Sequence, residues 1–409
     1  MSKSGSKTKP FKELISLESA QERLFDHIKP ISATEDISLN EALNRILAQD
    51  ITAGINVPPF ARAAMDGYAV VAEDTYNASD LKPKLLKCIG AIYAGDEPAL
   101  AMTQGQCVSI ATGAMLPDGA NSVAMVEYTE EFGDEIKIHK SVHPGENVSK
   151  RGNDIQEGTK PLFDGYELTA SRIGAVAALG IQRVEVYLKP KVAIAGTGNE
   201  ICPLGQELKP GQVYDINTYT LASVVKSSGG EPFLLGLVND TREALAEAFK
   251  KAIEFADIVV FSGGSSVGER DLLIDIFSAH GKVLFHGVQL KPGKPVLAAV
   301  VKDRICFGFP GFPTSCLTSA LIFLGPTVRK LAHGQAYWPK TVKAKLGRRV
   351  PSTLGRTQVL TVKIAEGVAQ PAFKESGAIT SMAEADGYIV IPSNVDLVEK
   401  DESVEVFLL

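Results

Sequence analysis

Two lysines on a proline-rich turn are the first residues whose types and spacing suit chemistry. Lys291 and Lys294 belong to the segment Lys291-Pro292-Gly293-Lys294-Pro295, in which two prolines stiffen the chain. A fixed pair of ammonium groups suits a dianion such as phosphate. The segment is not a Walker A loop, because the glycine spacing before it is wrong and Pro295 stands where Ser or Thr would bind magnesium. A solvated basic turn is the alternative interpretation, so this segment alone is a weak signal.

A long loop rich in glycine and serine follows a predicted strand and carries two acids. Backbone amides and hydroxyls in such a loop can hold an oxyanion, and its carboxylates suit magnesium. The alternative is a helix N-terminus at which the acids interact favourably with the helix dipole. We favour a functional role, because so long a loop rarely serves packing alone. Its candidate residues are Gly263, Gly264, Ser265, Glu269 and Asp271.

Two further acids follow predicted strands. Glu200 ends the segment Gly196–Glu200, where glycines let the backbone approach a ligand closely, although an ordinary turn with a solvated Glu is equally consistent. Asp240 precedes a predicted helix and Glu243 lies three residues further on, which is the spacing of a capping box. A cap is therefore the favoured role for Asp240, and metal binding at the carboxyl end of a strand is the alternative.

A fourth loop, residues 309–315, runs from a predicted strand into a predicted helix and contains Pro310 and Pro313. Thr314 or Ser315 is predicted to cap that helix. The free amides of the first turn would then face an anion. A cap without any ligand is the alternative.

Composition bounds the class of protein. The chain has 409 residues, 45% of them hydrophobic, and a net charge of -6, so neither a general nucleic-acid role nor a membrane-surface role is supported. Residues 1–14 are predicted to be a disordered leader, without the apolar core of a signal peptide. With no apolar run of membrane-spanning length, we expect a cytoplasmic protein.

The cysteines and histidines do not indicate a metal centre. None of the five cysteines has CxxC spacing, so free, reduced, mostly buried thiols are expected. His139 and His143 are four residues apart, but they lie in a segment that is predicted to be strand and turn, which makes a zinc site improbable.

The elements that position these loops alternate between strand and helix, which predicts an α/β domain with a mainly parallel sheet and ligands beyond the carboxyl ends of its strands. The predicted strands of this domain are 192–195, 233–238, 258–261, 296–300 and 304–308, and its predicted helices are 217–227, 241–256, 272–279 and 314–329.

The flanking segments differ in pattern. Residues 16–50 are predicted to be helical, with a first helix beginning at Ser16 and ending at Pro30 and a second at 39–47; a third spans 169–179. Short β-rich runs between 57 and 148 predict a β-rich lobe, and those after Tyr337 predict a C-terminal β-barrel.

Taken together, these segments resemble the MoeA family, which includes the gephyrin E domain, from about Ser16 to the C-terminus. The resemblance rests on many short motifs that occur in the family's order. They are Met65–Ala69, Thr112-Gly113 with Leu116-Pro117, Gly145–Val148, Gly152–Ile155, Gly196–Glu200, Tyr214–Asn217, Asp240, Ser262-Gly263-Gly264 with Val267-Gly268, Lys291–Pro295 and Pro310–Pro313.

The resemblance implies a fold, an assembly and a reaction. It implies a multidomain α/β protein that forms an elongated homodimer. In the presence of magnesium, adenylylated molybdopterin would react with molybdate to give molybdenum-molybdopterin and AMP. A separate molybdopterin adenylyltransferase and molybdoenzyme apoproteins are the implied protein partners. The expected domains are a leader (1–14), a segmented helical domain (15–56 and 149–187), a β-rich lobe (57–148), an α/β molybdopterin-binding domain (188–335) and a β-barrel (336–409).

The resemblance also implies site residues. The implied catalytic residues are Asp66, Thr112, Asp154, Glu200, Asp240 and Asp271, with Asp66 acting across the dimer cleft. Magnesium would be held by Asp240, Asp271 and Glu269. The implied binding residues for substrate are Asp215, Gly263, Gly264, Ser265, Lys291, Lys294, Pro310, Pro313, Ser315, Arg356, Ser376 and Ser381.

Three positions depart from the family pattern. Gly287 stands where some members carry a lysine, Phe312 replaces the usual Asn, and Ser265 replaces a usual Val. A divergent paralogue that uses tungstate is therefore an alternative. A non-catalytic scaffold on the same fold and a generic phosphate-ester or nucleotide-dependent enzyme are the others. The sequence retains all five carboxylates of the implied catalytic set, which are Asp66, Asp154, Glu200, Asp240 and Asp271. This argues against a scaffold, which needs none of them.

Overall fold

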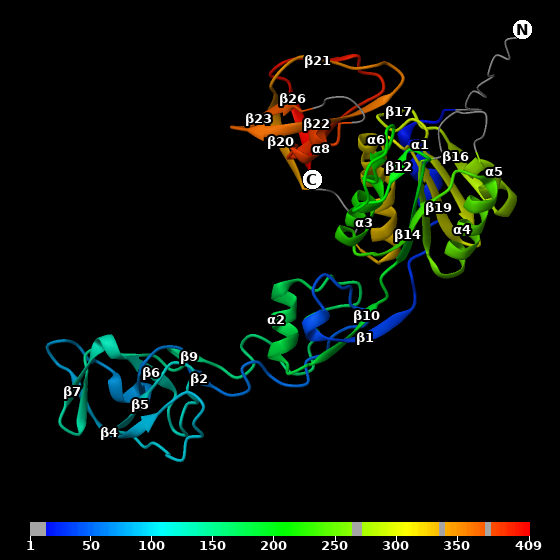
Figure 1. Cartoon of the computed structure of the whole chain (residues 1–409). Coiled ribbons are helices and arrows are strands. Elements are labelled where there is room, and N and C mark those ends of the chain that lie inside the picture. Colours follow the sequence, from blue (N-terminus) through cyan, green and yellow to red (C-terminus); the bar gives the residue numbers. More distant parts are fainter. Residues whose placement is uncertain (1–13, 264–271, 335–339, 373–377) are drawn as a thin grey trace, which may run out of the picture. The chain divides into compact units, whose positions relative to one another are not determined.

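The computed structural model describes residues 14–263, 272–334, 340–372 and 378–409 (Figure 1). The predicted leader therefore lies outside the described residues, apart from Leu14. The chain forms two compact units, one containing residues up to Glu35 together with Tyr187–Leu409 and the other spanning Asp36–Val186.

The first unit contains a six-stranded mixed sheet with helices on both faces. Neighbouring strands pair in parallel from β14 through β11 and β15 to β19, and antiparallel from β19 through β18 to β16. The mainly parallel α/β sheet predicted from the sequence is confirmed. In spatial order the strands are β14 (Glu231–Val238), β11 (Lys191–Thr197), β15 (Ile258–Ser262), β19 (Arg304–Phe309), β18 (Leu297–Val301) and β16 (Lys282–His286).

Both faces of the sheet are buried because both residue parities of its central strands are apolar. In β11, Val192 and Ile194 belong to one buried cluster, and Ala193 and Ala195 to the other. Among the described residues, six helices and a π-helical turn cover the two faces. They are α1 (Leu17–Phe25), α3 (Asn217–Ser227), α4 (Arg242–Phe255), α5 (Leu272–His280), and the continuous run of α6 (Pro313–Ser319), η4 (Ala320–Leu324) and α7 (Gly325–Leu331).

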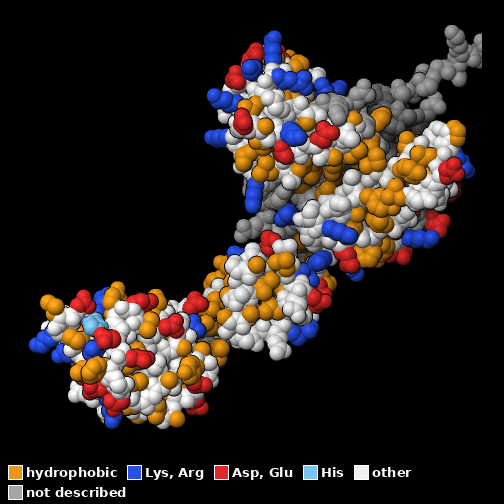
Figure 2. Space-filling view, turned by 60° about the vertical axis from the view of Figure 1, so that its left-hand side comes forward, with side chains coloured by type: hydrophobic (Ala, Val, Ile, Leu, Met, Phe, Trp, Pro, Cys, Tyr) orange, Lys and Arg blue, Asp and Glu red, His pale blue; other side chains and the backbone are white. Residues whose placement is uncertain are grey.

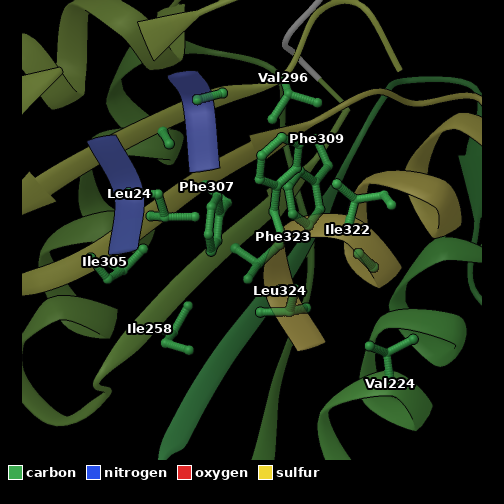
Figure 3. Packing of buried hydrophobic residues seen from close by; sticks show 14 of the residues in the cluster. Leu24, Val224, Ile258, Val296, Ile305, Phe307, Phe309, Ile322, Phe323 and Leu324 are labelled. Carbon is green, nitrogen blue, oxygen red and sulfur yellow. The ribbon is translucent and has the colours of Figure 1, made fainter. Parts of the chain in front are cut away.

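Figure 3 shows the first cluster from close by. Leu24 of α1 points at Phe307 of β19, and Phe323 and Leu324 of the π-helical turn approach the same strand face. Ser16 accepts a hydrogen bond from the Ser19 amide at 3.1 Å and so caps α1. The helix begins where the sequence predicts, but it ends at Phe25, before Pro30. Residues 15–56 were expected to form part of the linking domain, but α1 packs into the core of the α/β unit.

One edge of this sheet collects the loops that the sequence singles out. The parallel strands β14, β11, β15 and β19 all end there. Because β18 runs antiparallel to β19, with Leu297 opposite Gly308, its first residue lies at the same edge. The loops after Thr197, Val238, Ser262 and Phe309, and the lysine-bearing segment before Leu297, therefore share the carboxyl edge of the sheet.

The C-terminal part of the first unit is a closed five-stranded barrel. Its strands pair in the order β22-β23-β20-β26-β24, and β24 pairs again with β22. The predicted C-terminal barrel is confirmed. A sixth strand, β17 (Leu290–Lys291), joins it from the α/β domain by parallel pairing with β22. The barrel strands are β20 (Thr341–Leu346), β22 (Thr357–Ala365), β23 (Val368–Pro371), β24 (Gly387–Ile391) and β26 (Ser403–Leu408).

The second unit consists of a β-rich lobe and a short helical part. The lobe is a six-stranded sheet in the order β6-β3-β5-β4-β8-β7. The helical part contains α2 (Ala170–Ala178), which Thr169 caps through the Arg172 amide. The lobe strands are β3 (Gly67–Val70), β4 (Lys84–Ile92), β5 (Gln106–Ile110), β6 (Ser122–Met125), β7 (Thr129–Phe132) and β8 (Glu135–Ile138).

The helix predicted at 39–47 is wrong. Only a 3-10 turn, Leu39–Glu41, forms there, and β1 (Thr34–Ser38) precedes it. Asn44 has a φ of 61°, and its amide donates to Leu168 O, while the Leu47 amide donates to Tyr166 O. Pairing with a distant segment thus overrides a local helical pattern.

No helix in the described ranges is long and apolar enough to cross a membrane. On the face drawn in Figure 2, acidic and basic side chains are interspersed over each part of the chain. The described surface on this face therefore gives no large field of one sign.

Candidate functional site

Asp240 is an exposed carboxylate at one end of the carboxyl edge, just after β14. The prediction that it caps α4 is wrong. The cap is Thr241, whose hydroxyl accepts from the Ala244 amide at 3.3 Å. Relieved of that role, the Asp240 side chain makes no hydrogen bond or ion pair with the residues that the structure describes. Its oxygens are thus available to a cation.

Glu200 lies beyond β11 at the same edge, in the loop that follows Gly198. Both Glu200 carboxylate oxygens lie 2.9 Å from the position that a Cβ on Gly198 would occupy. Gly198 has a φ of 144°, so glycine is needed there both for the backbone and for the space. The Glu200 side chain therefore folds back over Gly198 at the end of β11, although the residue remains exposed.

Asp215 and Asn217 lie above the ends of β11 and β15, at the start of α3. Asp215 Oδ1 accepts from the Thr218 amide at 3.1 Å. Asn217 Nδ2 donates to Ser262 Oγ at 2.7 Å and to Gly311 O at 2.8 Å. These two contacts tie the loop after β19 to β15 and α3.

Gly263 is fixed at the end of β15. It has a φ of 98°, and a Cβ there would lie 2.2 Å from Thr197 O, so no other residue fits. The remaining predicted residues of this loop, Gly264, Ser265, Glu269 and Asp271, lie outside the described residues. Their expected roles stay predictions.

The lysine-bearing segment packs against α6. A Cβ on Gly293 would meet Ser319 Oγ at 3.0 Å and Ser315 O at 3.6 Å. This close approach places the backbone between Lys291 and Lys294 beside the first turns of the helix. The structure thus brings the predicted lysines and Ser315 into one neighbourhood.

The barrel adds a second contact to the lysine segment. Lys291 pairs with Gln358 in register, and Lys291 Nζ donates to Thr353 Oγ1 at 3.3 Å. The Arg356 amide donates to Thr353 O at 3.3 Å, so the turn that carries Arg356 adjoins Lys291. The structure thus brings together Lys291 and the turn of Arg356, both of which the resemblance implied.

The cap predicted for the last α/β helix is wrong. Helix α6 begins at Pro313, and its cap position is Phe312, which has no capping side chain. Proline at the first helical position has no N–H to satisfy, which removes one need for a cap. Thr314 and Ser315 are buried inside the first turn, and Pro310 is buried before it.

Ser381 of the barrel, in the short helix α8 (Thr380–Ala383), is fully buried, and its hydroxyl donates to Ala378 O at 2.8 Å. That bond uses its only hydrogen, so the contact does not support anion binding. Ser376 lies outside the described residues. Both roles stay predictions.

The second unit has a polar site of its own. Asp66 Oδ1 accepts from the Thr112 amide at 2.7 Å, which joins the loop before β3 to the loop after β5. The neighbouring Gly67 must be a glycine, because a Cβ there would lie 2.0 Å from Ala124 O of the paired strand β6. The Thr112 amide and, to a smaller extent, the Thr112 hydroxyl hold the pKa of Asp66 below its usual range. The structure thus joins two residues that the resemblance implied.

Removing the Thr112 hydroxyl should separate its two effects on Asp66. In Thr112→Val the hydroxyl is lost and the amide stays, so the pKa of Asp66 should rise but remain below that of an ordinary Asp. The contact stabilises the fold above the usual Asp pKa, and this contribution is lost as the pH falls through the lower folded-state pKa. Carboxyl-carbon NMR titration of wild type and variant measures the change. If the pKa of Asp66 were the same in Thr112→Val as in the wild type, the Thr112 hydroxyl would contribute nothing to the shift.

Asp154 does not join this pair. Its amide donates to Val57 O at 3.0 Å, and its exposed carboxylate makes no described contact with Asp66 or Thr112. Gly152 precedes it with a φ of 69°, where a Cβ would lie 2.5 Å from Asn56 Oδ1. The loop geometry is thus fixed, and the catalytic role of Asp154 stays a prediction.

Thr218 is a residue of the edge that the sequence reasoning did not single out. Its hydroxyl is buried and makes no hydrogen bond within the described part of the chain. A threonine in the first turn of a predicted helix gives no signal by itself. Only the fold shows that it lies over a glycine of the neighbouring strand.

A doubly covered α/β sheet with a carboxylate at one end of its carboxyl edge and two lysines at the other defines a ligand-binding α/β protein. Three family models cover the chain in order. The MoeA N-terminal region (domain I and II) matches residues 15–180, the "probable molybdopterin binding domain" matches 193–330, and the MoeA C-terminal region (domain IV) matches 343–409.

Whole-chain relatives agree. A molybdopterin molybdenumtransferase of a Nostoc species is 34% identical over 92% of this chain and 89% of its own. That of Bacillus subtilis is 32% identical over 94% of this chain and 91% of its own. The chain therefore belongs to the MoeA family.

Solved structures show the same fold over nearly the whole chain. Two crystal structures of the molybdopterin biosynthesis MoeA protein of Pyrococcus horikoshii are similar to it. One is 40% identical with a TM-score of 0.82 and covers 97% of this chain and 99% of its own. The other is 32% identical with a TM-score of 0.86 and covers 97% of this chain and 100% of its own.

Proposed function

We propose that this protein is a molybdopterin molybdenumtransferase, which inserts molybdate into adenylylated molybdopterin and releases AMP. The observation that carries the proposal is the shared carboxyl edge of the α/β sheet. Asp240 follows β14 at one end of this edge, and Lys294 precedes β18 four strands away, roughly 19 Å at the usual strand spacing. Together the occupants of this edge must span that distance, and a pterin joined to AMP through a phosphoanhydride, with molybdate beside it, would do so.

Magnesium is part of the proposal, and the donors present fit it. Magnesium is usually bound by one or two carboxylates together with substrate phosphates. Asp240 provides one exposed carboxylate without a described partner, and Asp271 and Glu269 would complete the set from outside the described residues. When bound, the ion would neutralise phosphate charge as the anhydride breaks.

The residues of this chain hold the two substrates in place. Asp240 positions the phosphate end, and the lysine segment holds the molybdate near Ser315. Ammonium groups stabilise the oxyanion through charge-assisted hydrogen bonds. Glu200, folded over the end of β11, is placed to orient substrate or water, as Asp154 would in its own unit.

Losing one of the two lysines should weaken molybdate binding. A charge-assisted hydrogen bond contributes about 1.5–3 kcal/mol, so Lys294→Ala should lower molybdate affinity about tenfold or more. Lys282→Ala is the matched control, because Lys282 begins β16 at the opposite edge of the sheet. Isothermal titration with molybdate compares the three proteins. Full affinity in Lys294→Ala would disprove this placement.

The direct test of the function mixes the protein with adenylylated molybdopterin, magnesium and molybdate. AMP release and activation of a molybdoenzyme apoprotein should rise together. Hydrolysis of simple nucleotides without any need for the pterin would favour a generic nucleotide-dependent enzyme. The absence of both activities would favour a scaffold. Running the reaction with tungstate compares the two oxyanions, for which Gly287, Ser265 and Phe312 are the relevant departures from the family pattern.

The proposal includes a cytoplasmic homodimer that meets a separate molybdopterin adenylyltransferase and molybdoenzyme apoproteins. Static light scattering of the purified chain tests the dimer. A monomer at all accessible concentrations would remove this part, together with the expected role of Asp66 across the dimer cleft.

A further inference from the structure

Three oxygen atoms gather above the ends of β11 and β15 without fulfilling their hydrogen-bonding capacity. Asn217 Oδ1 and Thr218 Oγ1 are buried and have no partner among the described residues. Asp215 Oδ2 lies beside them, 3.4 Å from the position of a Cβ on Gly196, and Thr218 Oγ1 lies 3.2 Å from that position. We call Asp215, Asn217 and Thr218, with Gly196 beneath them, the oxygen cradle.

The members of the cradle lie side by side on one face of the sheet. Gly196 and Ser262 are register partners on the neighbouring strands β11 and β15. Asp215 and Thr218 lie over Gly196, and the Asn217 amide is bonded to Ser262. Asp215 and Asn217 each keep 9% of their surface exposed, whereas Asn217 Oδ1 and Thr218 Oγ1 are themselves buried, so the cradle lies just beneath the surface.

The hydrogen-bond pattern fixes which atoms face the ligand. Gly311 O can only accept, so the atom of Asn217 that faces it must be Nδ2. Both Nδ2 hydrogens are then used on Gly311 and Ser262, and Oδ1 is left as a pure acceptor. Asp215 Oδ2 is a second acceptor, and the Thr218 hydroxyl can act in either direction. Buried polar atoms are nearly always satisfied, so this cluster calls for donors from outside.

An acceptor-rich, uncharged-to-negative cradle excludes phosphate and molybdate, which are themselves acceptors. We infer that it binds the amino-amide edge of the pterin, where a ring N–H and the 2-amino group present adjacent donors and the 4-oxo group can accept from Thr218. Adenine presents its amino group between ring acceptors and fits less well. This inference rests on the proposed function, since it assigns the pterin end of the substrate to named residues.

A matched pair of valine variants tests the cradle. Thr218→Val removes a buried hydroxyl that has no partner, so it should raise the unfolding temperature. It should also weaken binding of adenylylated molybdopterin about tenfold. Thr361→Val is the control, because Thr361 Oγ1 is likewise buried without a described partner but lies in the barrel. The control should also raise the unfolding temperature and leave the binding unchanged.

Gly196→Ala and a ligand series complete the test. The added methyl group would lie 2.8 Å from Leu237 Cδ2 and 3.2 Å from Thr218 Oγ1. It therefore fills the floor of the cradle and should weaken substrate binding at least as much as Thr218→Val. Pterin should compete with the substrate at least tenfold better than lumazine, in which an oxo group replaces the 2-amino group. This advantage should persist in Thr218→Val, because both ligands keep the 4-oxo group that Thr218 would contact. Unchanged substrate affinity in Thr218→Val, or equal competition by pterin and lumazine, would overturn the inference. So would a Thr218→Val variant that weakens AMP binding instead of pterin binding.

Failure of the inference is distinguishable from failure of the proposed function. If the wild-type protein releases AMP and activates apoprotein but does not discriminate pterin from lumazine, only the assignment of the pterin edge to the oxygen cradle is wrong. A wild-type protein without AMP release would sink the proposed function itself.

Discussion

Asp240→Asn should lower the rate of molybdenum insertion about 100-fold, the usual cost of removing one preorganised electrostatic contact to a reacting group. The side chain is exposed and bonds to none of the described residues, because Thr241 caps α4 in its place. The unfolding temperature should therefore stay unchanged. Raising the magnesium concentration should recover part of the lost rate, because the substitution weakens binding of the ion without removing its other donors.

Glu243→Gln is the matched control for this prediction. Glu243 is an exposed carboxylate in the first turn of α4, three residues from Asp240. Its neutralisation removes the same charge from the adjoining first turn of α4 and should change the rate less than twofold. Rates of AMP release at several magnesium concentrations compare the variants. Equal losses in both would mean that general charge, and not a ligand at Asp240, is responsible.

Gly263→Ala should be the most damaging small substitution at the edge. At a φ of 98° a non-glycine residue costs about 1–3 kcal/mol. The added Cβ would also lie 2.2 Å from Thr197 O, so β11 and β15 would have to separate where the ligand loops leave them. We expect loss of activity together with a clear fall in the free energy of unfolding.

Gly229→Ala separates the two causes. Gly229 has a φ of 87°, but a Cβ there would meet nothing within 4 Å. It therefore bears the backbone strain without the collision, and it should destabilise less and keep its activity. Denaturant unfolding and AMP release measured on both variants decide the matter. Equal destabilisation would show that the contact with Thr197 relaxes at no cost.

The sequence predicted the α/β domain well because its elements follow local periodicity. The helix at 217–227 begins and ends where it was predicted, and both parities of β11 are apolar, as a doubly covered strand requires. The helix predicted at 39–47 failed because partners more than a hundred residues away fix that segment. The cap predicted at Asp240 failed by one residue, because Thr241 caps α4. The cap predicted at Thr314 or Ser315 failed because α6 already begins at Pro313, after Phe312.

The candidate site was predictable as a set of motifs but not as an arrangement. Sequence order placed Asp66 and Thr112 in one family pattern, yet only the fold shows the amide of one on the carboxylate of the other. The sequence did not single out Thr218, because only the fold shows that its hydroxyl is buried and has no hydrogen-bond partner among the described residues. The strand order, which separates Asp240 from Lys294 by four strands, follows from pairing between distant segments.

Amide hydrogen exchange with and without adenylylated molybdopterin and molybdate would probe the carboxyl edge most directly. Slower exchange is expected in 196–201, 214–219, 239–243 and 290–295, with the opposite edge around 301–304 unaffected. If those four segments exchanged at unchanged rates while the ligand protected another region, the substrate would bind elsewhere and the account would be wrong.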